Sequence, residues 1–287
     1  MKDSILVTGA TGTIGRDVVK YLSRKNAAVR AAVRDRTKAA QHLGSEIELC
    51  EFDFVNETTF GRALAEVKAI FLLPPLGPDQ TQIVNRFVDA AKQAGVRHIV
   101  KLSAIDADRA LPFAVGTCHA ANDRHIRNSG VSFTLLRPNS FMQNFINYFP
   151  PRDGAIYLPW GNGRASFIDT RDIAEVAAQA LTDESHANQT YTLTGPAALG
   201  IGEVADMLSE AVGRQFKYVD VLESAAREGM LQAGLPQWQV DALMELHAIN
   251  KQSEWSAVTR DVENIVGRAP IDFPAFARDH AEKFAAN

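Results

Sequence analysis

A single stretch, Ile5-Leu-Val-Thr-Gly-Ala-Thr-Gly-Thr-Ile-Gly15, defines the first structural unit of this chain. It runs from an apolar strand into a glycine-rich turn, and Arg16–Leu22 behind it carries apolar residues at helical spacing. Gly9 allows a tight turn, Gly12 lets backbone N–H groups approach a phosphate, and Gly15 lets the helix pack close to the strand. The helix N-terminus adds a partial positive charge. The stretch predicts a β-α unit that binds a pyrophosphate; an ordinary strand, turn and helix with incidental glycines is the alternative.

Apolar, β-rich runs alternate with amphipathic helical stretches through the first half of the chain. This rhythm indicates parallel β-α-β winding, and the continuous apolar character is typical of strands covered on both faces. A helix is expected at Gln82–Gly95, with apolar residues on one face and Gly95 as its stop signal. We expect an α/β fold, a Rossmann-type doubly wound parallel sheet, with strands at Ile5–Thr8, Ala28–Val33, Ile47–Phe52, Ala69–Leu73, His98–Ser103 and Ser132–Leu136.

The rhythm breaks after Arg137-Pro138 into a segment rich in loops, residues 139–164. Regular structure is expected to return at Ser166–Ile168, followed by a helix at Asp172–Leu181, a strand of the main sheet at Thr190–Thr194, a strand at Phe216–Val221 and a last helix at Pro274–Phe284. These patterns predict a nucleotide-binding domain of residues 1–138 plus 166–195. Residues 139–165 plus 196–287 are expected to form a smaller, mostly helical lobe that closes over the cofactor and binds the substrate.

Composition narrows the class of protein. The 287 residues carry a net charge of −4 with scattered basic side chains, so no surface for nucleic acid or an anionic membrane is expected. The N-terminus begins with a strand and no apolar run is long enough to span a bilayer, which predicts a cytoplasmic protein. Cys50 and Cys118 lie far apart without metal-binding spacing, so we expect idle thiols and no metal site.

The end of the second strand selects between NADPH and NADH in such folds. Arg34 follows Val33 here, and Lys38 lies one turn into the next helix, so two cations stand where a 2′-phosphate would bind. Asp35 is the competing residue, because its carboxylate would bind a ribose 2′-hydroxyl and permit NADH. We expect NADPH, with NADH possible; a solvated arginine and lysine at a helix start would look the same.

Two further strand ends suit a cofactor groove. Asp53-Phe54 follows the third strand, where Asp53 would accept a hydrogen bond from adenine, although an ordinary helix N-cap at Asp53 or Asn56 explains it equally well. Leu73-Pro74-Pro75 follows the fourth strand at the edge that faces the ligand, and prolines are also common turn residues.

The glycine spacing here is Gly-x-x-Gly-x-x-Gly, which is wider than the usual Gly-x-Gly-x-x-Gly of dinucleotide-binding turns. It resembles the short-chain dehydrogenase/reductase superfamily, and the motifs together resemble its NmrA-like branch. The motifs are Val7-Thr-Gly-Ala-Thr-Gly-x-x-Gly15, Val33-Arg34, Gly95-Val-x-His98, Lys101-Leu-Ser103, Ser129-Gly-Val-x-Phe-Thr-Leu-Leu-Arg-Pro138, Asp169-Thr-Arg-Asp-Ile-Ala174 and the tail Asp261-Val-Glu-x-x-x-Gly267 with Phe273-x-x-Phe276-x-x-Asp279-His280. That branch includes NADPH-dependent quinone reductases, triphenylmethane and azo dye reductases, and non-catalytic NADP sensors. The resemblance implies cofactor contacts at Gly9, Thr11, Gly12, Thr13, Ile14, Gly15, Arg34, Lys38, Asp53, Phe54, Leu73, Pro74, Pro75, Ser103, Pro138 and Asn139.

The superfamily's usual tyrosine and lysine are missing from the position where they belong. The resemblance places the active-site helix at Val115–Arg127, with His119 in place of the lysine. Tyr21 and Lys25 match the Tyr-x-x-x-Lys spacing only by accident, on the first helix. His119 and Ser103 are the candidate catalytic residues, with Asn144 as a third. The competing interpretations are a helix-face His119 paired with Asp123 and a Ser103 that only ties down the strand end.

Loss of the proton donor restricts the acceptor. A hydride added to a ketone makes a strongly basic alkoxide, whereas a quinone gives a phenolate-like anion whose conjugate acid has a pKa of roughly 10. We therefore expect hydride transfer to a quinone, azo dye or triphenylmethane dye without flavin or metal. The alternatives are a non-catalytic NADP(H) sensor and an epimerase or dehydratase of a nucleotide sugar, which would need the missing tyrosine and lysine.

Aromatic side chains follow the break at Arg137-Pro138 and would suit a flat acceptor. A hydrophobic core would use the same residues. A homodimer is common in the superfamily, and nothing in the sequence decides it. The expected acceptor contacts are Asn139, Phe141, Met142, Asn144, Phe145, Tyr148, Tyr157 and Trp160.

Overall fold

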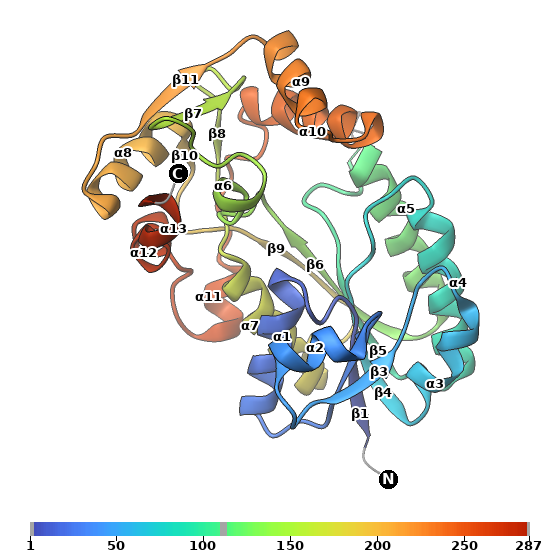
Figure 1. Ribbon diagram of the computed structural model, residues 1–287. Helices are drawn as coiled ribbons and strands as arrows, with labels where there is room; N and C mark the ends of the chain where they lie inside the picture. The colour runs from blue at the N-terminus through green and yellow to red at the C-terminus, as the bar shows by residue number, and fades with distance from the viewer. Residues whose placement is uncertain (1–2, 110–113, 286–287) are drawn as a thin grey trace. The chain divides into compact units, whose positions relative to one another are not determined.

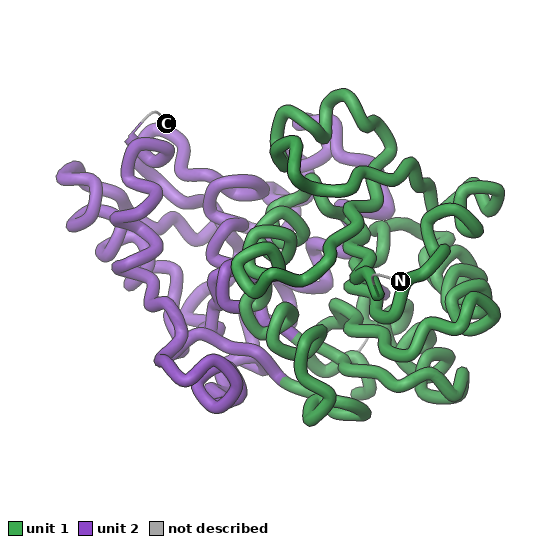
Figure 2. The backbone as a smooth tube through the Cα atoms, turned by 90° about the horizontal axis from the view of Figure 1, so that it is seen from below, with its two compact units in different colours: residues 1–109, 115–137, 173–191 green, residues 110–114, 138–172, 192–287 purple. Residues whose placement is uncertain are grey.

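The computed structural model describes residues 3–109 and 114–285. The chain forms two compact units, each built from segments that are distant in sequence (Figure 2). Unit 1 comprises residues 1–109, 115–137 and 173–191, and unit 2 comprises residues 110–114, 138–172 and 192–287.

Unit 1 is built on a seven-stranded sheet with the order β3-β2-β1-β4-β5-β6-β9 (Figure 1). Every pairing from β3 through β6 is parallel. The chain moves outward from β1 through β2 to β3, then returns to the other side of β1 with β4, so the strand order reverses between β1 and β4. Crevices at such reversals, outside the carboxyl ends of the strands, are where α/β sheets bind ligands. The strands are β1 Ser4–Val7, β2 Val29–Val33, β3 Glu48–Glu51, β4 Val67–Leu72, β5 His98–Leu102, β6 Ser132–Pro138 and β9 Gln189–Leu193.

Helices cover both faces of this sheet. One face packs against α3, α4 and α5, whose side chains share a single apolar cluster with strands β1 to β6. Helices α1, α2 and α7 accompany the other face (Figure 1). There Lys25, at the end of α1, donates a hydrogen bond to Gln179 of α7 at 2.8 Å. The helices are α1 Thr13–Arg24, α2 Arg36–Leu43, α3 Phe60–Leu64, α4 Gln80–Gln93, α5 Ala114–Ser129 and α7 Thr170–Thr182, with short 3-10 turns η1 Glu57–Thr59 and η2 Glu184–His186.

Unit 2 is mostly helical and has its own core. Two small sheets, β7 with β11 in parallel and β8 with β10 antiparallel, pack with the helices around a cluster of phenylalanines and aliphatic side chains. The strands are β7 Ala155–Leu158, β8 Arg164–Ala165, β10 Leu199–Gly200 and β11 Lys217–Asp220. The helices are α6 Asn144–Asn147, α8 Ile201–Val212, α9 Glu223–Gln232, α10 Gln237–Lys251, α11 Asp261–Val266, α12 Phe273–Asp279 and α13 Ala281–Ala285.

The structure confirms the predicted fold class and the return of β9 to the main sheet. Two local expectations are wrong. The last helix is broken at His280, which ends α12 before α13 begins at Ala281. Ser166–Ile168 is no strand of a sheet and forms only an isolated bridge between Ile168 and Phe141. The free thiols Cys50 and Cys118 form no disulfide.

The packing of α1 on β1 leads to a stability prediction. A Cβ atom added at Gly15 would lie 2.2 Å from the Gly9 carbonyl oxygen, a backbone atom that cannot move aside. We expect Gly15→Ala to destabilise unit 1 by about 1–3 kcal/mol, the usual cost of overpacking. The measurement is the urea midpoint of unfolding.

Gly229→Ala is the matched control. Gly229 lies inside α9 with no atom within 4 Å of an added Cβ, so the same substitution should leave stability unchanged or raise it by up to about 1 kcal/mol. An unfolding midpoint for Gly15→Ala equal to that of the unsubstituted protein would contradict the close approach.

Candidate functional site

The turn between β1 and α1 is held in a conformation that suits glycine. Gly9 has φ +62°, and an added Cβ would lie 2.5 Å from the Leu73 side chain. The buried Thr8 hydroxyl joins this turn to the end of β4, because it donates to the Phe71 carbonyl at 3.1 Å and accepts from the Leu73 N–H at 2.8 Å. These contacts bring the carboxyl ends of β1 and β4 together at the reversal of strand order.

The N-terminus of α1 offers free backbone donors. Gly12 is its N-cap, no side chain caps it, and its first turn has no acidic residue. The first N–H groups of a helix lack intrahelical partners, and the helix dipole adds positive charge there. Gly9 and residues 11–13 are exposed around it, while Ile14 is buried and anchors the helix. The turn therefore fits a pyrophosphate, whose oxygens would accept these hydrogen bonds.

After the end of β2, the arginine expected to favour NADPH and the aspartate expected to favour NADH have different surroundings. Arg34 is exposed, whereas the Asp35 carboxylate accepts hydrogen bonds from the Thr37 and Lys38 backbone N–H groups, each at 3.0 Å. Asp35 is thus the N-cap of α2, the alternative role for the residue that would have favoured NADH. The Lys38 side chain is 82% exposed and lies 3.8 Å from Asp35. The two cations remain accessible to a 2′-phosphate.

Asp53 and Phe54 have local structural partners. Asp53 accepts from the Val55 N–H at 3.1 Å, and Asn56 is the N-cap of the following 3-10 turn. Phe54 makes an edge contact with Phe52, with ring centroids 4.7 Å apart, and is partly buried against the core. In the β4 loop, Pro74 is buried while Leu73 and Pro75 are half-buried.

Beneath the ends of β5 and β6 lies a buried cluster of charged and polar side chains. Lys101 on β5 is fully buried, and its ammonium contacts His119 Nδ1 at 3.0 Å and Asp123 Oδ1 at 2.7 Å. Ser103 donates to Asp123 Oδ2 at 2.8 Å. Arg137 of β6 lies 3.3 Å from the same oxygen, and its other nitrogen pairs at 2.8 Å with Asp108. Two cations and two carboxylates thus balance one another.

The structure does not support the competing interpretation that pairs His119 with Asp123. The partner of His119 is Lys101 and not Asp123, because Asp123 is already engaged by Lys101 and Ser103. Burial, with a further contribution from the Lys101 charge, lowers the pKa of His119 well below its usual range, so the ring does not titrate near neutrality.

Sequence reasoning assigned no role to Lys101 or Arg137. The available signal was a lysine inside the apolar run Ile99-Val-Lys-Leu102 and an arginine ending Leu135-Leu-Arg137, both in strands covered on two faces. A charged side chain there must be paired. The accidental pair on α1 is peripheral, since Lys25 donates to Gln179.

Several residues of unit 2 that were expected to contact a ligand instead make contacts within the unit. The Asn139 amide donates to Ser166 Oγ and to the Trp255 carbonyl, both at 2.7 Å, and its oxygen accepts from the Ser140 N–H. An amide with these three bonds holds loops together, so the side chain of Asn139 is not free for a cofactor. Pro138 beside it is buried.

Three predicted acceptor contacts are core residues. Met142, Phe145 and Trp160 are each at most 2% exposed and belong to the apolar cluster of unit 2. Trp160 stacks on Phe167 and donates to His247 Nδ1 at 2.8 Å, and burial lowers the pKa of His247 to about 4. The core alternative is therefore the better description of these side chains. Phe141 and Asn144 are half-buried, while Tyr148 and Tyr157 are exposed, at 50% and 46%.

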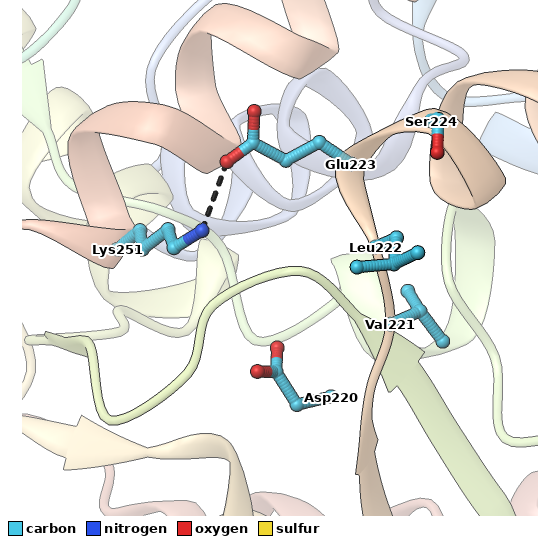
Figure 3. Close-up of a pocket in the computed structure, with 6 residues that line it drawn as sticks. All are labelled: Asp220, Val221, Leu222, Glu223, Ser224 and Lys251. Carbon is cyan, nitrogen blue, oxygen red and sulfur yellow. Dashed lines mark hydrogen bonds and ion pairs between the residues drawn. The ribbon is translucent and has the colours of Figure 1, made fainter.

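Unit 2 also carries a shallow surface pocket of about 430 Å³ (Figure 3). Its charges are paired internally: Lys251 donates to Glu223 at 2.9 Å, and Asp220 accepts from the Gly161 N–H and the Tyr218 hydroxyl. None of the predicted site residues lines it. Within residues 3–109 and 114–285, three or more His, Cys, Asp or Glu side chains nowhere gather as metal ligands would. No helix in the same described residues has the length and apolar character needed to cross a membrane.

Comparison with known proteins agrees with this architecture. An NAD(P)H azoreductase of Xenophilus azovorans is 38% identical over 284 residues, covering 98% of this chain and 99% of that protein. Prestalk A differentiation protein A of Dictyostelium discoideum is 32% identical, covering 97% and 92%. The crystal structure of Citrobacter sp. triphenylmethane reductase complexed with NADP(H) superimposes with a TM-score of 0.84 at 25% identity, covering 97% of this chain and 99% of that one.

The NmrA-like family matches this chain over residues 1–268. With the motifs of the β1–α1 turn, the strand order and near full-length relatives above 30% identity in agreement, the chain belongs to the NmrA-like family.

Proposed function

We propose that this protein is an NADPH-dependent reductase that delivers hydride to a quinone or a similar conjugated aromatic acceptor, with azo and triphenylmethane dyes in the same class. The observation that carries the proposal is the uncapped N-terminus of α1 at the strand-order reversal, with two exposed cations at the end of β2. The azoreductase and triphenylmethane reductase relatives support the class of acceptor.

The residues of unit 1 would bind both charged groups of the cofactor, the pyrophosphate and the 2′-phosphate. Backbone N–H groups of the Gly9–Gly15 turn would bind the pyrophosphate, and Arg34 with Lys38 would bind the 2′-phosphate. Asp35 caps α2 through one carboxylate oxygen, which orients its side chain toward the Thr37 and Lys38 N–H groups. When bound, the reduced nicotinamide supplies the hydride.

The described residues near the end of β5 favour acceptors that need little acid catalysis. Ser103 already donates a hydrogen bond to Asp123, and burial keeps His119 neutral by lowering its pKa. A quinone or a cationic dye needs no proton in the hydride step, because the product is a phenolate-like anion of pKa roughly 10 or a neutral molecule. Orientation against the nicotinamide would then supply most of the rate. Phe141, Asn144, Tyr148 and Tyr157 remain the proposed acceptor contacts of unit 2.

A non-catalytic NADP(H) sensor is the second candidate. The specific observation in its favour is the 32% identity with a protein named for differentiation, prestalk A differentiation protein A. Such a protein would bind the cofactor through the same turn and reduce nothing.

Turnover is the direct test. Purified protein should oxidise NADPH, followed by absorbance, in proportion to enzyme concentration and with saturation by quinones, azo dyes or triphenylmethane dyes. Because the exposed Arg34 and Lys38 would bind the 2′-phosphate that NADH lacks, NADH should be used less well. Tight NADPH binding by fluorescence without reduction of any acceptor above the protein-free rate would instead favour the sensor.

Cofactor selection is tested by Arg34→Ala. Loss of a charge-assisted contact with the 2′-phosphate should raise the KM for NADPH by roughly 10- to 100-fold and leave that for NADH unchanged. Arg62→Ala is the matched control, since Arg62 is equally exposed but lies on α3, and it should change neither value. An equal rise for both cofactors would contradict the assignment of Arg34.

A further inference from the structure

The buried cluster under β5 fixes the direction of each of its hydrogen bonds. A carboxylate only accepts and an ammonium only donates, so the hydroxyl and the imidazole between them have no choice of role. The atoms in question are Ser103 Oγ, 2.8 Å from Asp123 Oδ2, and His119 Nδ1, 3.0 Å from Lys101 Nζ.

Ser103 uses its only hydroxyl hydrogen in the hydrogen bond that it donates to Asp123. With that bond made, the Ser103 oxygen offers lone pairs and no hydrogen to a ligand. It would accept a hydrogen bond from an N–H group, such as the carboxamide of a nicotinamide, and would not donate one to an acceptor oxygen.

His119 has the opposite character. Since Lys101 donates to Nδ1, the proton of the neutral ring resides on Nε2. Among the described residues Nε2 has no recorded hydrogen-bond partner, and His119 retains an exposure of 6%. An N–H donor thus remains available at the surface of the cluster.

Topology brings this donor to the ligand edge of the sheet. Ser103 directly follows β5, and α5 runs back from that carboxyl edge after the connection. His119 lies one turn before Asp123, nearer the start of α5 and hence nearer the edge.

We propose that Lys101 is a positioning residue, which holds His119 as the Nε2–H tautomer so that the ring donates a hydrogen bond to the reduced acceptor and transfers no proton. The inference rests on the proposed reductase function. A quinone that gains one hydride, two electrons with one proton, becomes the hydroquinone monoanion. His119 Nε2–H would bind that anionic oxygen, and water supplies the second proton after release.

The surrounding charges keep His119 out of acid–base chemistry. Lys101 contacts the His119 ring from β5. The other charges of the cluster pair with one another, Asp123 with Lys101 and Arg137, and Arg137 with Asp108. Burial and Lys101 both disfavour the imidazolium, which agrees with the lowered pKa of His119. Turnover should therefore show no ionisation of this histidine between about pH 6 and pH 8.

The first test is the nitrogen spectrum of His119 in the intact protein, by ¹⁵N-detected NMR with no acceptor present. We expect an unprotonated Nδ1 and a protonated Nε2 that do not change between about pH 6 and pH 8. The reversed tautomer, or titration within this range, would overturn the inference. Since no turnover is needed, this outcome is independent of whether the protein proves to be a reductase.

Kinetics of three variants provide the second test. His119→Leu removes the donor and should lower kcat by roughly 100-fold with little change in the KM for NADPH, a loss typical of one donor to a developing oxyanion. His119→Gln keeps an N–H near the Nε2 position and should recover at least about tenfold of that loss. A glutamine variant no better than the leucine variant would contradict the donor role.

Lys101→Met removes the ammonium that directs the ring. His119 is then free to pair with Asp123, so its pKa should rise and kcat should become pH-dependent. Lys68→Met on β4 is the matched control outside the cluster and should keep the flat pH profile. A pH profile for Lys101→Met that stays flat would count against the positioning role. If Lys101→Met does not fold, the ¹⁵N spectrum of the unsubstituted protein and the comparison of His119→Gln with His119→Leu still test the tautomer and the donor role of His119.

Discussion

The close approach of α1 to the turn after β1 is the constraint on which the rest of unit 1 depends. Only a residue without a Cβ allows position 15 to lie against the Gly9 carbonyl, and only a glycine at position 9 combines φ +62° with contact to Leu73. The Thr8 hydroxyl then ties the turn to β4. One small region thereby joins the ends of β1 and β4 at the strand-order reversal and places the uncapped N-terminus of α1 there.

A second constraint is the cost of burying charge. Lys101 is completely buried, and an ammonium there is tolerated only because Asp123 lies 2.7 Å away and His119 accepts a further hydrogen bond. Desolvation nevertheless lowers the pKa of Lys101. Replacing Lys101 alone by an apolar residue would leave the buried Asp123 carboxylate with less compensation, so Lys101 and Asp123 depend on each other.

The chemistry follows from what this arrangement lacks as well as from what it holds. The described residues at the end of β5 offer a neutral N–H donor and a hydroxyl that accepts, with no acid poised for proton transfer. Hydride acceptors whose reduced form is a stabilised anion or a neutral molecule suit such an edge. The relatives of this chain include proteins named as an NAD(P)H azoreductase and a triphenylmethane reductase.

The sequence by itself determined the fold class, and it predicted a phosphate-binding turn and two cations beyond β2, because glycine spacing, strand rhythm and a strand-end arginine are local patterns. Only the tertiary structure decided which neighbouring group each polar side chain bonds to. Asp35 became an N-cap, Asn139 a tie between loops, and Trp160 a core residue bonded to His247. The partner of His119 came from a strand 18 positions earlier and not from the same helix. Helical spacing predicts contacts within a helix, but the electrostatic need of a buried lysine for partners acts through space, and the sequence does not show which side chains folding brings within its reach.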